Sequence, residues 1–265
     1  MTQSPKEKAL HDALIRCVSI TPEMPLMLSG GLDSLCVLAA LMEIGSRPTC
    51  FTFYAYPNDD LRSSQRIAKA LRLRHVLVPI PLGDVQLRHD VAQIIKLIGK
   101  TNKIDVQVSH PILYAARAIL REGHGGAWTG LDRGDLYGLQ KDNMIKRWTQ
   151  GDAVWQQARV ESQQEGDRDS SVSINRTALS CGVVLNHAFW DEGVVSAVLA
   201  MNYRELHRPR PKSALMRAFP DFFKSHALYR RPAAYQVESG IRLLHNSLLD
   251  GTGFKDVAAV YRRMV

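Results

Sequence analysis

The chain has 265 residues, of which 45% are hydrophobic, and 34 lysines and arginines against 26 acidic residues give a net charge of +8. This hydrophobic share supports a packed core and excludes an intrinsically disordered chain. No apolar run approaches the roughly 20 residues that cross a bilayer, so no membrane span is expected. The first residues carry no apolar signal core and the four cysteines form no CxxC pair, which predicts a cytoplasmic protein with reduced thiols.

Strand-like and helix-like segments alternate through the first half of the chain. Helices are expected over residues 1–20, 35–44, 58–73, 84–98 and 110–122, and strands over 25–28, 49–55, 75–80 and 127–129. Strands that alternate with helices of this length predict an α/β fold with a parallel, doubly wound sheet.

The β signal stops after Gly138, and the following residues, 139–182, are polar and charged. Within them, 161–173 is rich in small and charged residues and is expected to form a mobile loop. Further helices are expected over 190–201, 212–219, 234–248 and 253–264. The sequence therefore predicts an α/β nucleotide-binding part, 1–140, and a mostly helical part, 141–265, which together complete one domain.

A glycine-rich segment, Ser29-Gly30-Gly31-Leu32-Asp33-Ser34, lies between an expected buried strand and an expected helix. Two glycines let the backbone approach an anion, and the serine hydroxyls and the N–H groups at the helix start can donate to it. A carboxylate at Asp33 would repel phosphate unless a divalent cation bridges the two. The alternative is a plain strand–helix turn in which Asp33 caps the helix; the strand–loop–helix context favours phosphate binding.

SGGLDS resembles the PP-loop of the ATP pyrophosphatase superfamily, and more closely that of the synthetase domain of the asparagine synthetase and β-lactam synthetase family. The resemblance implies an adenine nucleotide α-hydrolase-like fold that binds ATP and Mg²⁺. It also implies cleavage of ATP between its α- and β-phosphates, which gives an adenylated substrate and pyrophosphate. The nucleotide-binding residues that it implies are Ser29, Gly30, Gly31, Leu32, Asp33, Ser34, Phe53, Gly130 and Arg210.

Residues 129–138 (TGLDRGDLYG) are similar to the family's GEGADELFGG loop, which helps bind Mg²⁺ and pyrophosphate. The family's first glutamate falls on Leu131 and its aspartate on Gly134, so Asp132 or Asp135 is expected to join Asp33 as a metal ligand. Weaker similarities to the family cover His75, residues 186–191 (NHAFWD), Arg230-Arg231-Pro232 and Ser239-Gly240.

Residues 211–217 (PKSALMR) resemble the family's K-x-x-L-R helix, whose lysine stabilises charge during amide or ring formation. The resemblance implies catalytic roles for Lys212, for Asp33 through its metal, and for Arg217, with Arg210 assisting. Residues 203–232 also hold eight basic and two acidic residues, which is most of the chain's positive excess. Fixed cations there would meet a pyrophosphate leaving group, although a solvated helix face is the alternative explanation.

The leading hypothesis is an ATP-dependent, pyrophosphate-forming adenylating enzyme that acts on a small molecule. The second is a PP-loop enzyme that modifies a nucleobase in DNA or tRNA on the basic surface, including by displacement of a pyrophosphate already attached to it. The third is a degenerate nucleotide-binding protein, which the residues at 131 and 134 motivate. No cysteine follows Met1 and residues 1–24 are too few for a glutaminase domain, so none is expected in the same chain; the oligomeric state stays open.

Overall fold

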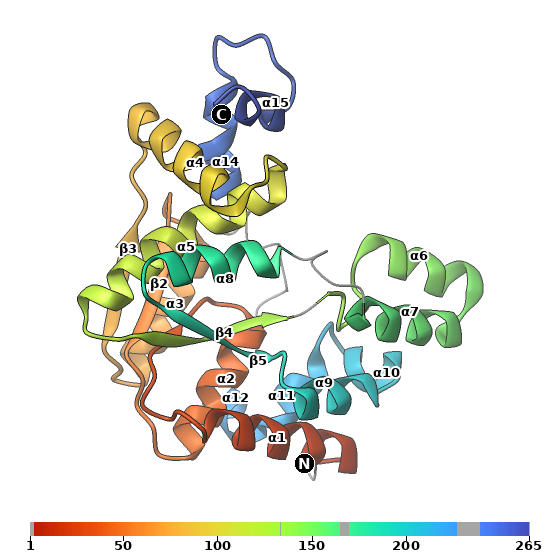
Figure 1. Cartoon of the computed structure of the whole chain (residues 1–265). Coiled ribbons are helices and arrows are strands. Elements are labelled where there is room, and N and C mark those ends of the chain that lie inside the picture. The colour runs from red at the N-terminus through yellow and green to blue at the C-terminus, as the bar shows by residue number, and fades with distance from the viewer. Residues whose placement is uncertain (1–2, 133, 165–169, 227–238, 265) are drawn as a thin grey trace.

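A computed structural model describes residues 3–132, 134–164, 170–226 and 239–264 (Figure 1). Five parallel strands form one sheet in the order β3-β2-β1-β4-β5, with β1 in the centre. Their bounds are β1 Leu26–Met27, β2 Cys50–Tyr54, β3 His75–Pro79, β4 Gly126–Asp132 and β5 Val184–Phe189. The chain moves outward from β1 in one direction and returns to β4 on the other side, so the topological switch point lies between β1 and β4. Ligands of such sheets bind at the carboxyl ends of the strands at this point.

Helices cover both faces of the sheet (Figure 1), so the expected parallel, doubly wound α/β fold is confirmed. One face packs against α1 (Pro5–Val18), α2 (Leu32–Glu43), α3 (Asp59–Ala70) and α9 (Glu192–Leu199). The other face packs against α5 (Lys103–Arg121) and α8 (Ser171–Ser180), with α4 (Asp84–Ile98) against α5. The remaining elements are α6 (Lys141–Gln150), α7 (Asp152–Gln164), α10 (Tyr203–His207), α11 (Ser213–Ala218), α12 (Pro220–His226), α14 (Ile241–Asn246), a 3₁₀ turn (Ser247–Leu249) and α15 (Val257–Tyr261). None of the helices in the described ranges is long and apolar enough to cross a membrane.

Helix α2 is the central helix of the larger core cluster. Nine of its residues, from Leu32 to Leu41, are buried, and it packs against α1, α11 and β4. A helix that is apolar on all sides is stable only where it is enclosed. Its first turn, which carries Asp33 and Ser34, is therefore held in place by its neighbours.

The prediction that β structure ends after Gly138 is wrong. Residues 184–189 form β5, which pairs in parallel with β4, for example at Thr129↔His187. The run VVLNHAF contains a strand signal that the polar residues before it obscured. The sheet is thus completed by a strand from the second half of the chain.

The polar residues 139–182 form helices α6, α7 and α8. Part of the expected mobile loop is helical, since residues 161–164 end α7 and 171–173 begin α8, and 165–169 lie outside the described residues. Helical structure is favoured here because α7 and α8 each bury an apolar face, with Trp155 in the core and Ile174 against the sheet.

A chain of buried polar side chains joins α14 and α15 to α4 and α5. His245 Nδ1 shares a hydrogen bond with the hydroxyl of Tyr261, and His245 Nε2 shares one of 3.0 Å with His110 Nδ1. His110 Nε2 then donates to Asp90 Oδ2 at 3.3 Å, and Tyr114 donates to the same oxygen. Buried hydrogen bonds thus link Tyr261 on α15 to Asp90 on α4 through the two histidine rings.

The stability of the protein is expected to fall as the pH drops below about 6.5, the ordinary pKa of histidine. Burial, with His110 beside it, lowers the pKa of His245 well below that value. The unfolded chain therefore takes up a proton that the folded chain excludes, which costs up to about 1.4 kcal/mol per pH unit. Asp90 acts in a lower window, because hydrogen bonds outweigh its burial and lower its pKa to about 2.

Urea unfolding at pH values between 7 and 4.5 measures this slope. The matched variant His245→Asn should be less stable at pH 7 but should lose less free energy of unfolding as the pH falls. Parallel slopes for the two proteins would contradict the assignment of the effect to His245.

Candidate functional site

The SGGLDS loop connects β1 to α2 at the switch point of the sheet. Two serines brace it: Ser34 Oγ accepts from Ser29 N at 3.2 Å and Ser29 Oγ accepts from Gly31 N at 3.1 Å. Gly30 N donates to the carboxylate of Asp60 at 3.1 Å, and a Cβ on Gly30 would lie 2.7 Å from Cβ of Ser63. These contacts fix the loop at the start of α2, and a helix N-terminus is a position that binds phosphate.

A second glycine controls how closely β4 approaches this loop. A Cβ added to Gly130 would lie 2.4 Å from Ser34 N and 2.7 Å from the carbonyl carbon of Asp33. Backbone therefore lies directly against backbone, and only glycine leaves room for it. Gly130 sets the distance between the end of β4 and the first turn of α2.

Lys212 and Asp33 meet at the centre of the site although 179 residues separate them in the sequence. Lys212 Nζ donates to Asp33 Oδ2 at 2.7 Å and lies 3.8 Å from the centre of the Tyr137 ring. Burial alone would lower the pKa of Lys212, but the Asp33 and Asp132 carboxylates outweigh it and raise that pKa. The lysine is therefore a cation at neutral pH.

Asp132, at the end of β4, is the second carboxylate of this cluster. Burial and the charges of Asp33 and Asp135 raise its pKa to about 6, while Lys212 acts in the opposite direction. Asp33 Oδ1 is buried and accepts no hydrogen bond from the described residues. The carboxylates of Asp33 and Asp132 together fit a divalent cation whose other ligands are phosphate oxygens and water, as is usual for Mg²⁺. The described residues contain no group of three or more acidic, histidine or cysteine side chains that would form a complete protein cage.

Asp135, the other metal ligand expected, is occupied by its own segment. Its carboxylate accepts from Leu139 N at 2.9 Å, from Gln140 N at 3.0 Å and from the side chain of Asn143 at 2.7 Å. Three donors already satisfy it, and they anchor the start of α6. These contacts favour Asp132 over Asp135 as the partner of Asp33.

Arg217 is directed to a different part of the molecule from Lys212. Its guanidinium bonds to the carboxylate of Glu7 on α1 and to the backbone carbonyls of Glu205 and Arg208. All three nitrogens are therefore used to join α11 to α1 and to the segment before it. These contacts favour a structural role for Arg217, and its expected catalytic role stays a prediction.

The remaining expected contacts are less direct. Arg210 is exposed, and its backbone N–H and C=O both bond to the hydroxyl of Ser213. Phe53 lies half-buried near the carboxyl end of β2, beside the central strand, and its expected role in nucleotide binding stays a prediction. Arg230 and Arg231 lie outside the described residues.

His75 lies outside the site and supports the SGGLDS loop indirectly, through hydrogen bonds that lead from β3 to β1. Its Nε2 bonds to Thr52 Oγ1 at 2.8 Å, and that hydroxyl donates to the carbonyl of Leu28 at 2.6 Å. Leu28 immediately precedes the loop, so this chain of bonds fixes the end of β1 across three strands.

Sequence reasoning missed a group of side chains that hold the loop carrying Tyr137. Three consecutive carbonyls, those of residues 136–138, each accept one side-chain hydrogen bond of 2.9 Å, from Arg159 Nε, His207 Nε2 and Trp155 Nε1 in that order. Arg159 is fully buried and also bonds to carbonyls of α9 and the residues after it. The loop is thus fixed from α7 and α10, and no local sequence signal marks these residues.

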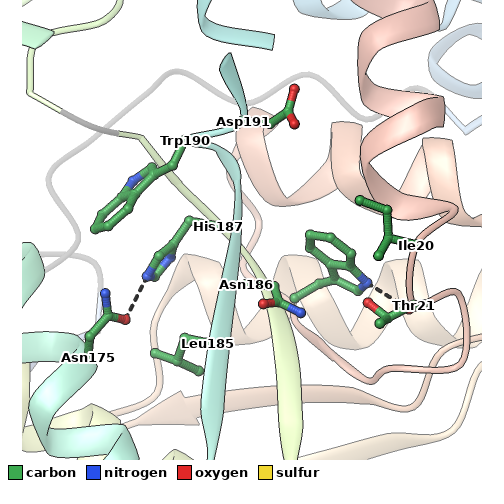
Figure 2. Close-up of a pocket in the computed structure, with 9 residues that line it drawn as sticks. Ile20, Thr21, Asn175, Leu185, Asn186, His187, Trp190 and Asp191 are labelled. Carbon is green, nitrogen blue, oxygen red and sulfur yellow. Dashed lines mark hydrogen bonds between the residues drawn. The ribbon is translucent and has the colours of Figure 1, made fainter. Parts of the chain in front are cut away.

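A separate shallow pocket of about 350 Å³ lies along the open edge of β5 (Figure 2). His187 stacks on Trp190 with ring centres 4.1 Å apart, bonds to Asn175 at 2.8 Å and accepts from Thr129 at 2.6 Å. Asp191, in the family-like segment 186–191, caps α9 through Val194 N. None of the residues expected in the active site lines this pocket, so it is distinct from the Lys212–Asp33 cluster.

Comparison with protein families finds that residues 7–127 match the asparagine synthase family, while no curated protein matches the chain. The matched segment is just under half of the sequence and runs from α1 to the start of β4. It contains the SGGLDS loop, and the structure places that loop at the switch point of a parallel sheet. Residues 7–127 therefore carry a match to the asparagine synthase family, the synthetase domain of the PP-loop superfamily.

Proposed function

We propose that the protein is an ATP-dependent, pyrophosphate-forming enzyme that adenylates a carboxylate and passes it to an amine, as in an amide-forming synthetase. The observation that carries this proposal is the 2.7 Å contact between Lys212 Nζ and Asp33 Oδ2. It joins the lysine of the K-x-x-L-R-like segment, which the family match does not cover, to the aspartate of the PP-loop. A phosphate loop, a cation and two carboxylates in one place are the parts that release of pyrophosphate requires.

The residues of the site have distinct roles in this proposal. The N–H groups of the PP-loop, with Ser29 and Ser34, bind the β- and γ-phosphates, and Gly130 keeps β4 against them. Asp33 and Asp132 hold Mg²⁺, which, when bound, neutralises the developing charge on the phosphate oxygens. Attack of a substrate carboxylate oxygen on the α-phosphorus breaks the α–β bond and releases pyrophosphate. Lys212 stabilises the added negative charge, and an incoming amine then displaces AMP.

The nucleotide product tests this proposal. ATP labelled at the α-phosphate is incubated with the protein, Mg²⁺ and a metabolite extract that supplies the acceptors. The label is expected in AMP, with no labelled ADP, and the Asp33→Asn variant should abolish the reaction. ADP as the product, or AMP formation unchanged in Asp33→Asn, would contradict the proposal. Nucleotide binding without any AMP formation would favour the hypothesis of a degenerate nucleotide-binding protein.

A second candidate function is modification of a base in DNA or tRNA. The observation in its favour is that four basic residues of one segment are exposed: Arg204, Arg208, Arg210 and Lys224. Exposed cations that neutralise phosphates give binding that weakens steeply with salt. Binding to tRNA or duplex DNA between low and physiological salt, for the wild type and for an Arg208→Gln, Arg210→Gln double variant, distinguishes the two functions. Binding that is absent, or unaffected by salt and by these changes, would exclude the second candidate.

A further inference from the structure

We propose that His207 is a positioning residue that holds Lys212 over Tyr137 and against Asp33. The inference rests on the proposed function for its catalytic meaning, but the geometry behind it does not. Within the described residues, His207 makes no hydrogen bond to the PP-loop or to the acidic residues beside it. It acts through the backbones of Lys212 and Tyr137. Its ring accepts from the N–H of Lys212 at 3.1 Å and donates to the carbonyl of Tyr137 at 2.9 Å.

The backbone of Lys212 needs this support. Lys212 has φ 60°, in the left-handed region, where a residue with a side chain is strained. It is also buried and stands just before α11, so an N–H without an acceptor would be costly. His207 Nδ1 provides that acceptor, and it selects the conformation from which the side chain reaches Asp33.

The His207 imidazole also fixes Tyr137, whose aromatic face contacts the ammonium group of Lys212. Tyr137 supplies the aromatic face 3.8 Å from Lys212 Nζ, and its carbonyl is the acceptor of His207 Nε2. One imidazole therefore fixes the lysine's backbone and the tyrosine's backbone relative to each other. Only a neutral histidine with its proton on Nε2 can do both, since the protonated ring has no acceptor.

The surroundings of His207 keep it in that state. It is buried, and its ring packs against Tyr203 at 4.8 Å and Trp155 at 6.0 Å between ring centres. Burial lowers its pKa to about 4, and the positive charges of Arg159, Lys212 and Arg147 add to the effect. The bridge is therefore intact throughout the neutral range.

Two substitutions separate the two hydrogen bonds. In His207→Asn the side-chain oxygen takes the place of Nδ1 and keeps an acceptor for Lys212 N. In His207→Gln the amide nitrogen takes the place of Nε2 and keeps the donor to Tyr137, while Lys212 N loses its acceptor. Tyr203→Phe is the matched control, because it changes the neighbouring ring and removes neither bond.

Acetylation of Lys212 with limiting acetic anhydride, followed by mass spectrometry, reads out its position without ATP or an acceptor. His207→Gln should raise the acetylation rate of Lys212 about tenfold, the effect of one lost buried hydrogen bond, relative to exposed Lys96. His207→Asn and Tyr203→Phe should leave Lys212 close to wild-type protection. The buried thiol of Cys50 monitors opening of the fold, and it should stay unreactive.

A Lys212 that stays protected in His207→Gln, or that is exposed equally in His207→Asn and His207→Gln while Cys50 is unreactive, would overturn the inference. If the glutamine variant opens at Cys50, His207→Phe replaces it, because phenylalanine keeps the ring packing and removes both bonds. In the AMP-forming assay, the loss in His207→Gln should appear in kcat with the KM for ATP little changed. Failure of the proposed function would leave the acetylation result standing, so the two are tested separately.

Discussion

Replacement of Lys212 by methionine is expected to lower the rate of AMP formation by about 10²–10³-fold, the usual loss when one fixed donor to a developing charge is removed. Lys212 Nζ lies 2.7 Å from Asp33 and its side chain is only 10% exposed, so a cation from the solvent has little access to the position of the ammonium group. Methionine keeps the length and packing of the stem and removes only the charge. The measurement is the initial rate of AMP release from α-labelled ATP at saturating Mg²⁺.

Lys224→Met is the matched control for this experiment. Lys224 lies on α12 and is exposed, so its replacement removes the same charge from the same basic segment but not from the site. Equal losses in the two variants would mean that the net charge of the segment, and not the position of Lys212, carries the effect. A rate unchanged in Lys212→Met would remove the lysine from the mechanism.

Gly130→Ala should disturb both the fold and the candidate site. Its Cβ would stand 2.4 Å from Ser34 N, where both groups are backbone and neither can rotate away. We expect the free energy of unfolding to fall by about 1–3 kcal/mol, as for other overpacked positions. We also expect AMP formation to fall about 10²-fold, because the first turn of α2, with Asp33 and Ser34, must shift to admit the methyl group.

Gly125→Ala tests whether this effect is specific. Gly125 lies just before β4, has no left-handed φ, and a Cβ there would meet no atom within 4 Å. Chemical unfolding and the AMP assay on both variants separate loss of the fold from displacement of the loop. If Gly125→Ala were as inactive as Gly130→Ala, the close contact with α2 would not be the cause.

The parts of this site that the sequence predicted are the parts with local signals. SGGLDS carries its own glycines, hydroxyls and carboxylate in six consecutive residues, and Lys212 stands in a short helical motif. Alternation of β-rich and helical segments likewise predicted the sheet through β4. In each case the residues that interact, or the pattern that they form, are near one another in the chain.

The missed residues act through contacts that have no local pattern. Two of these residues, Trp155 and Arg159, lie on α7, and His207 lies on α10. Each donates to a backbone carbonyl of residues 136–138, and nothing in the sequence of those residues indicates which side chain will bond to them. Arg217 is a different case: its motif predicted a catalytic role, which stays a prediction, while the structure pairs its charge with Glu7 on the first helix. The partner of a charged side chain is decided by tertiary packing.

The position of β5 in the second half of the sequence limits how the protein can be divided into fragments that fold. Without residues 184–189, β4 would be an uncovered edge strand, open to pairing with other chains. The N-terminal helix α1 would also lose α9 and α11, against which it packs. A fragment cut at residue 127, the end of the family-matched segment, would also lose most of β4, so it would contain the whole PP-loop but only three of the five strands in full. We therefore expect a fragment that folds alone to extend at least through α11, which packs against α1.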